Sequence, residues 1–351
     1  MSGLRQLMES PTEWLEGAGE EEELVLSSRV RLARNLDRVP FPHRAKPSVK
    51  REVLQQVEKS LLDSASMRSA ITIEMDAIPA NDRMVLLERH LVSIEMVQDH
   101  EKSALVVQKG ERLSAMINEE DHLRIQSLES GLSIRSAFER IEELDDELDE
   151  RLNYAFSENL GFLTACPTNV GTGLRVSAMV HLPGIVHNKD LPQIIKGLNN
   201  VRLTVRGMYG EGSNAMGNIF QISNGITLGL SEEDTVRGLE SHLRKVLEFE
   251  KKAREVLLRK ARSLLEDRIY RAHGILRSAR LVTSKEAMDL LSDVRLGVGL
   301  GIINDVSIAK LNELLIMIKP MHLQELHGRP MSPEERDKVR ADFIRGKLGG
   351  S

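Results

Sequence analysis

The spacing of apolar residues changes once along this sequence, near residue 231, and that change restricts the fold more than any other feature. Before it, apolar and polar side chains alternate in short segments such as 201–206 and 219–223, as they do in half-buried strands. After it, the spacing is helical throughout. The sequence therefore predicts an α+β protein, with an antiparallel-sheet domain at residues 1–250 and a helical domain at residues 251–351.

Charge and composition exclude several kinds of protein. Lys and Arg number 48 against 53 Asp and Glu, a net charge of −5 over 351 residues. Neither nucleic acid nor an anionic membrane is therefore expected as a direct partner. The one cysteine, Cys166, excludes an intrachain disulfide and indicates a reducing, cytoplasmic location. We expect no signal peptide at the start, and no apolar run of about 18 residues is present that could span a membrane.

An arginine pair stands in the segment SSRVR at 27–31. In a strand, Arg29 and Arg31 point to the same face because side chains alternate with a period of two. Two guanidinium groups on one face repel each other unless an anion lies between them, and their planar forks suit phosphate. The alternative is a pair of surface arginines without a ligand.

Three carboxylates crowd together at Glu119, Glu120 and Asp121, in the segment NEED followed by HLR. Clustered carboxylates bind cations or serve as general bases. In strand geometry, Arg124 shares the face of Glu120. The alternative is a polar turn that joins two strands. The ten histidines include no H-E-x-x-H pair, so a catalytic metal cage is not expected.

A third segment, CPTNVGTGLR at 166–175, places glycines after the single cysteine. Gly171 and Gly173 could let backbone amides approach an anion, although the spacing is not that of a Walker phosphate-binding loop. Cys166 followed by proline does not match a metal-binding pattern.

Together these segments resemble the phosphagen kinase family, the ATP:guanidino phosphotransferases, and within it the bacterial branch that acts on arginine in proteins. The resemblance covers residues 20–250 and includes RGMYGE at 206–211 and FQISN at 220–224. It implies an antiparallel-sheet catalytic domain that transfers the γ-phosphoryl group of Mg-ATP to a guanidinium nitrogen. Members for small guanidines begin with a separate helical domain, for which we expect no room before SSRVR. This sequence instead carries a helical C-terminal part, as the protein-directed branch does.

The resemblance also implies a role for each site residue. Two carboxylates, Glu120 and Glu211, would hold the acceptor guanidinium and take its proton. Cys166 would lie beside that guanidinium as a thiolate that steers it without forming a covalent bond. Magnesium would be held by nucleotide oxygens and water, so no protein metal ligand is expected. The implied phosphate-binding residues are Arg29, Arg31, Arg124, Arg175 and Arg206.

Partners follow from the same resemblance. It implies protein substrates with exposed arginine, a heat-shock repressor and clients of a Clp ATPase among them, in stress response and protein quality control. It also implies an activator of the McsA type, which is a zinc protein.

A charge pair near the C-terminus, Arg336 and Asp337, suggests a second binding site. The arginine could bond the phosphate of a phosphorylated arginine while the aspartate bonds its guanidino group. The alternative is an ordinary solvated first turn of a helix. Apolar residues on the preceding helix, Leu311, Leu314 and Leu315 among them, are interpreted as core or as the face of a homodimer.

Three alternatives to a protein kinase remain open. A small-molecule arginine kinase would use the same site, and a non-catalytic adaptor would bind phosphoarginine and deliver clients to a protease. The weakest alternative is a cysteine hydrolase that pairs Cys166 with His181, because such a pair needs a proximity that sequence cannot show.

Overall fold

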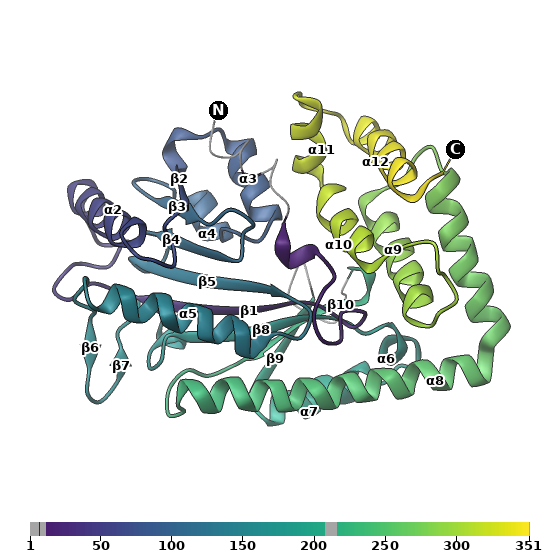
Figure 1. Cartoon of the computed structure of the whole chain (residues 1–351), viewed down its shortest axis with the longest axis horizontal. Coiled ribbons are helices and arrows are strands. Elements are labelled where there is room, and N and C mark those ends of the chain that lie inside the picture. Colours follow the sequence, from purple (N-terminus) through teal and green to yellow (C-terminus); the bar gives the residue numbers. More distant parts are fainter. Residues whose placement is uncertain (1–6, 8–11, 208–215, 351) are drawn as a thin grey trace.

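The computed structural model describes residues 7, 12–207 and 216–350. Its centre is an eight-stranded sheet with the strand order β2-β3-β4-β5-β1-β8-β10-β9, in which all neighbours are antiparallel (Figure 1). This confirms the predicted fold class. The strands of this sheet are β1 (Val25–Arg34), β2 (Ile71–Glu74), β3 (Ala104–Val107), β4 (Leu113–Ile117), β5 (Leu123–Ser130), β8 (Leu174–His181), β9 (Leu203–Gly207) and β10 (Ile219–Asn224), and a separate hairpin consists of β6 (Phe156–Ser157) and β7 (Gly161–Phe162).

Helices pack against both faces of the sheet and form the whole C-terminal part (Figure 1). The α-helices are α2 (Pro47–Leu62), α3 (Ala80–Glu88), α4 (Ile94–Gln98), α5 (Ile134–Asp149), α6 (Pro183–His187), α7 (Leu191–Asn200), α8 (Glu232–Ser278), α9 (Ser284–Gly299), α10 (Ile308–Met317), α11 (Pro320–His327) and α12 (Pro333–Leu348). Short 3₁₀ turns are η1 (Glu13–Leu15), η2 (Met75–Ala77), η3 (Pro167–Asn169) and η4 (Met216–Asn218). No helix among the described residues is both long and apolar enough to cross a membrane.

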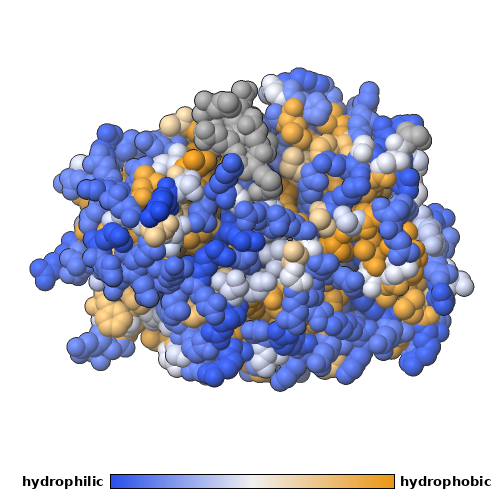
Figure 2. Space-filling view, in the orientation of Figure 1, coloured by the Kyte–Doolittle hydropathy of each residue, from blue (hydrophilic) through white to orange (hydrophobic). Residues whose placement is uncertain are grey.

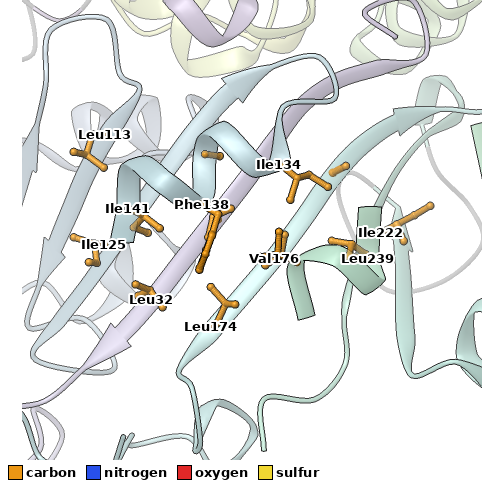
Figure 3. Close-up of a cluster of buried hydrophobic side chains, with 14 of the residues drawn as sticks. Leu32, Leu113, Ile125, Ile134, Phe138, Ile141, Leu174, Val176, Ile222 and Leu239 are labelled. Carbon is orange, nitrogen blue, oxygen red and sulfur yellow. The ribbon is translucent and has the colours of Figure 1, made fainter. Parts of the chain in front are cut away.

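The two faces of the sheet differ because side chains alternate along each strand. One face is apolar, and its Leu32 and Val176 lie against Phe138 of α5 (Figure 3). The first half of α8 covers the rest of this face, where Leu239 lies near Ile222. Burial of this face against two helices stabilises the fold. The opposite face packs against α3 and α4 over β2, β3 and β4, and it carries polar side chains on the central strands.

The long helix α8 joins the sheet to the C-terminal part. Leu239 in its first half belongs to the core under the sheet, whereas Leu265 and Ile269 in its second half belong to a separate core. The helix is broken at Ala261, where φ is −144° and ψ is 36°. The predicted domain boundary at residue 250 falls within α8, before this break, and the division into two domains stays a prediction.

The C-terminal core is built from α8 to α12. Leu311, Leu314 and Leu315 are buried in it, so these three residues are core residues. The last helix begins with a full capping box, in which Ser332 accepts a hydrogen bond from the Glu335 amide and the Glu335 carboxylate accepts one from the Ser332 amide.

Polar contacts fasten the C-terminal helices to the sheet. Arg295 of α9 donates to the carbonyl oxygens of Glu22 at 2.6 Å and Glu23 at 3.1 Å. The Glu88 carboxylate of α3 accepts from the backbone amide and the ring of His322, at 3.0 and 2.8 Å, at the start of α11. These contacts hold the helices beside the sheet face that carries the polar residues (Figure 1).

Candidate active site

Four of the arginines implied by the resemblance share the polar face of the sheet. Arg29 and Arg31 lie two residues apart in β1, and Arg31 is directly opposite Arg175 of β8. Arg124 of β5 is opposite Ala33, which lies two residues beyond Arg31. Because directly opposed residues of antiparallel strands point to the same face, the four guanidinium groups gather on one surface.

Arg206 extends this group across two more strands. It lies in β9 opposite Gln221 of β10, which is opposite Met179 of β8, four residues beyond Arg175. Arg29 donates from Nη2 to the Gln221 side-chain oxygen at 2.9 Å, which ties the group together. We call the set Arg29, Arg31, Arg124, Arg175 and Arg206 the arginine row.

Burial and mutual repulsion act on the arginine row. Burial, together with repulsion from Arg124 and Arg175, lowers the pKa of Arg29 to about 10. Burial, together with repulsion from Arg29, Arg124 and Arg175, holds the pKa of Arg31 well below its ordinary value. The Nε atoms of Arg31 and Arg175 are buried without a hydrogen-bond partner among the described residues. Since buried cations are stable when paired, this arrangement is suited to binding an anion.

Glu119 is the carboxylate that supports the arginine row. Its side chain is buried, and its Oε1 lies 2.7 Å from Nη1 of Arg124. Burial raises the pKa of Glu119, but Arg124 and hydrogen bonds outweigh this effect and leave the pKa below its ordinary value. Glu119 is therefore ionised and holds Arg124 in position.

Asp121 connects the carboxylate segment to the segment of the single cysteine. Its Oδ1 accepts from the Asn35 side-chain amide at 2.6 Å and from the Ala165 backbone amide at 2.7 Å. Asp121 is buried, and neither of its two donors is charged. It therefore fixes Cys166, the next residue after Ala165, beside the loop that carries Glu120.

Glu120 is the one carboxylate of the three that has no hydrogen-bond or ion-pair partner among the described residues. It is half-buried. Burial, together with the neighbouring Asp121 and Glu119 carboxylates, raises the pKa of Glu120. A carboxylate that is free, accessible and more basic than usual suits a general base.

Cys166 lies at the edge of the same site. Its Sγ is 3.0 Å from the Thr168 hydroxyl oxygen, and the residue is half-buried. Burial and repulsion from Arg206 lower the pKa of Arg175, and Cys166 opposes this shift. The sulfur atom is thus close enough to the arginine row to act on it electrostatically.

Gly171 allows close packing of the backbone, and its amide is not presented to an anion, although the sequence had suggested this. The Gly171 φ is +113°, and a Cβ there would collide with the Thr227 carbonyl oxygen. The Gly171 amide donates to the Phe162 carbonyl at 3.4 Å, and the Thr172 amide donates to the Thr227 carbonyl at 3.1 Å. These amides are already occupied within the protein.

The remaining predicted residues lie elsewhere. Glu211 lies outside the described residues. Arg336 and Asp337 lie in α12, in the helical part and away from the sheet (Figure 1). Asp337 already pairs with Arg340, whereas Arg336 is half-buried and has no side-chain partner among the described residues.

The cysteine-hydrolase alternative is wrong. Cys166 precedes the start of β8, and His181 is at the far end of that eight-residue strand, which spans on the order of 20 Å. His181 is fully buried and bonds the Ser292 hydroxyl of α9 at 2.8 Å. The ring is therefore unavailable to the thiol.

Sequence reasoning missed the surroundings of Arg29. A narrow cavity next to it is lined by Trp14, His90, Met179 and Gln221, among other residues. His90 also lines a larger, mostly apolar cavity of about 430 Å³ between α3, α9 and α11. These residues are far apart in the sequence and belong to no motif, so no local signal could have found them.

Comparison with known proteins agrees with this geometry. The family model of the ATP:guanido phosphotransferase C-terminal catalytic domain matches residues 52–253, and that of the protein-arginine kinase McsB C-terminal domain matches residues 262–351. The crystal structure of lombricine kinase superposes with a TM-score of 0.59 at 25% sequence identity. The match covers 69% of this chain and 71% of the lombricine kinase chain. The duplicated taurocyamine kinase from Schistosoma mansoni, solved with transition state analog components, shows the same fold at a TM-score of 0.61 and 24% identity, over 79% of this chain and 41% of its own.

The fold and site therefore define an ATP:guanido phosphotransferase. The protein-arginine kinase of Brevibacillus brevis is 46% identical over 98% of this chain and 97% of its own length. The protein-arginine kinase of Halothermothrix orenii is 45% identical over 95% of this chain and 96% of its own length. The chain belongs to the protein-arginine kinase family, which confirms the family that the sequence motifs had indicated.

Proposed function

We propose that this protein-arginine kinase transfers the γ-phosphoryl group of ATP to a guanidino nitrogen of arginine in a polypeptide, at the arginine row. The observation that carries the proposal is the gathering of five arginines on one face, two of which, Arg31 and Arg175, have buried Nε atoms that lack partners among the described residues. Phosphoryl transfer depends mostly on positioning and charge neutralisation, and planar guanidinium forks provide both.

The arginine row and the cavity next to it fit a nucleoside triphosphate. The row offers the positive charge that a polyphosphate needs, and the apolar cavity beside His90 would accept the base. No three His, Cys, Asp or Glu side chains among the described residues lie together in a way that could hold a metal ion. We therefore assign Mg²⁺ to nucleotide oxygens and water, where it would neutralise charge on the transferring group.

The acceptor guanidinium needs carboxylates, because its nitrogen is a poor nucleophile while protonated. We assign Glu120 and Glu211 to hold it in line with the phosphorus. As the nitrogen–phosphorus bond forms, the guanidinium proton passes to Glu120, and the electrons of the broken phosphorus–oxygen bond remain on ADP. Cys166 would orient the guanidinium from the side.

The pH dependence of the rate tests the role of Glu120. Since its pKa is raised, the rate should fall on acidification at a higher pH than for an ordinary glutamate. The exposed Glu95 on α4 contributes to this rise by charge alone. Glu95→Gln should therefore shift the acid limb of kcat/KM to lower pH, and the shift should shrink in high salt. An acid limb unchanged by Glu95→Gln would contradict the assignment.

Location, protein targets, activator and oligomeric state are the next part of the proposal. We propose that the enzyme is cytoplasmic, marks damaged proteins for a Clp ATPase, modifies a heat-shock repressor, and is activated by a partner of the McsA type. A homodimer is also proposed.

Transfer from labelled Mg-ATP to an unfolded arginine-rich protein and, separately, to free arginine tests the substrate class. The expected product is acid-labile, base-stable label on the protein alone. Label on free arginine would indicate a small-molecule kinase, and binding of phosphoarginine without transfer would indicate an adaptor.

We further propose that Arg336 and Asp337 bind phosphoarginine. Arg336 lacks a side-chain partner among the described residues, and Asp337 is partly exposed beside Arg340. Calorimetric titration of the full chain with phosphoarginine should lose one of two binding events in Asp337→Ala and retain both in Glu334→Ala, a control on the same helix turn. Two unchanged binding events in Asp337→Ala would remove the proposal.

A further inference from the structure

A group of large apolar side chains is exposed at the end of the sheet near Cys166. Phe156 is 60% exposed, Leu160 47%, Leu228 53% and Leu230 45%. They line a groove of about 370 Å³ between the β6–β7 hairpin and the segment that follows β10. Figure 2 shows an apolar area at the lower left, where Figure 1 places this hairpin. We call these four residues and the space between them the hairpin groove.

Contacts with buried side chains hold the β6–β7 hairpin beside the groove in place. The Arg34 guanidinium carbon lies 3.5 Å from the centre of the Phe162 ring, and the Phe156 ring meets Phe162 edge-on at 5.2 Å between centres. Arg34 is buried, pairs with Asp145 at 2.6 Å and donates to the Thr172 carbonyl at 2.8 Å. Several interactions thus hold the apolar residues in the exposed position, which is typical of a binding surface.

The hairpin groove is close to the active site along the chain. Gly171 and Thr172 line it, and they follow Cys166 by five and six residues. The Thr227 hydroxyl, on the other wall, lies 2.9 Å from the Thr168 carbonyl oxygen and 2.7 Å from that of Val170. An extended chain covers at most about 3.5 Å per residue, so about five residues of an extended substrate reach from Cys166 to the hairpin groove.

Charge around the hairpin groove is negative. Glu232 is the one charged residue in its lining and lies 3.6 Å from the buried Arg34, which also pairs with Asp145. Glu158 is exposed on the hairpin between Phe156 and Leu160. The neighbouring helix α5 adds the exposed Glu142, whose charge acts on Glu232. A surface that is apolar and acidic complements a segment that carries apolar and basic side chains, and arginine-containing segments of unfolded proteins have this character.

We propose that the hairpin groove binds an apolar side chain of the protein substrate, within about five residues of the target arginine, and so selects unfolded polypeptides. A folded protein buries its large apolar residues, whereas an extended unfolded segment presents them beside its arginines. This inference rests on the proposed function and adds a determinant of substrate choice outside the catalytic residues.

The test measures binding and turnover in the double variant L228S/L230S. Its Kd for a reduced and carboxymethylated, fluorescently labelled lysozyme, in the presence of Mg-ADP, should rise about tenfold, since about 1.4 kcal/mol of apolar contact is lost. KM for the same protein should rise equally at unchanged kcat. KM for a short Gly/Ser peptide with one arginine should not change, and one leucine added to that peptide should lower KM only in the wild type.

Phe249→Ser is the matched control, because Phe249 on α8 is 53% exposed and lies outside the groove. It should leave every constant unchanged. An unaltered Kd in L228S/L230S, or an equal loss in the Phe249→Ser control, would overturn the proposal. Because the Kd needs no turnover, a wild type that binds the probe but phosphorylates nothing would count against the proposed function and not against the groove.

Discussion

Glu120→Gln is expected to lower kcat by about 10²–10⁴-fold while leaving the affinity for Mg-ATP unchanged. Glutamine keeps the shape and accepts hydrogen bonds, but it cannot take the guanidinium proton. Nucleotide affinity should persist because Glu120 makes no ion pair with the arginine row, whereas the adjacent Glu119 does. Single-turnover rates and equilibrium nucleotide titration separate the two quantities.

Glu119→Gln provides the comparison, since it removes a carboxylate of equal size one residue away. This change should weaken Mg-ATP binding and lower thermal stability, because Arg124 loses its buried partner at 2.7 Å. A Glu120→Gln enzyme with wild-type kcat, or two variants with the same profile, would show that Glu120 is not the base.

Arg31→Met is expected to abolish nucleotide binding and yet to stabilise the ligand-free protein, by about 1–4 kcal/mol. Arg31 is half-buried among like charges, its buried Nε has no partner among the described residues, and its pKa is held well below its ordinary value. Methionine fills a similar volume without this cost. Thermal unfolding with and without Mg-ATP measures both effects.

Arg34→Met is the matched control in the same strand, on the opposite face. Arg34 pairs with Asp145 at 2.6 Å, so its removal leaves a carboxylate without its buried partner and should destabilise by about 3–5 kcal/mol. The wild type should gain about 2.7 kcal/mol at a ligand concentration of 100 Kd, and Arg31→Met should gain nothing. A destabilised Arg31→Met variant that still responds to Mg-ATP would contradict the role given to the row.

The sequence predicted the site best where arginines are two residues apart in a strand. Arg29 and Arg31 could be assigned to one face from spacing alone, and the register of β1 with β8 then added Arg175. The segment NEED could be singled out, but not the division of labour within it. Glu119 and Asp121 are structural because they bond Arg124 and Asn35, whereas Glu120 is free, and these contacts become visible only in the fold.

Contacts between distant segments explain the rest. The hairpin groove combines Phe156 with Leu228, which are 72 positions apart, and neither belongs to a motif. The long helix α8 hides the boundary from the sequence, because its apolar residues up to Ala253 pack in the sheet core and those from Leu257 onward pack in the C-terminal core, on both sides of the break at Ala261. Glycine spacing suggested anion binding at Gly171, whereas the close approach of the Thr227 carbonyl is the actual reason for that glycine.

A crystal structure of the full chain with Mg-ADP, arginine and a planar anion in place of the transferring phosphoryl group would show where the reacting groups bind. We expect the phosphates and the anion to lie on the arginine row and to bond the Nε atoms of Arg31 and Arg175, which lack partners among the described residues. We expect the acceptor guanidinium to lie against Glu120. A nucleotide bound elsewhere, with those Nε atoms still unpaired, would show that the arginine row is not the phosphate site.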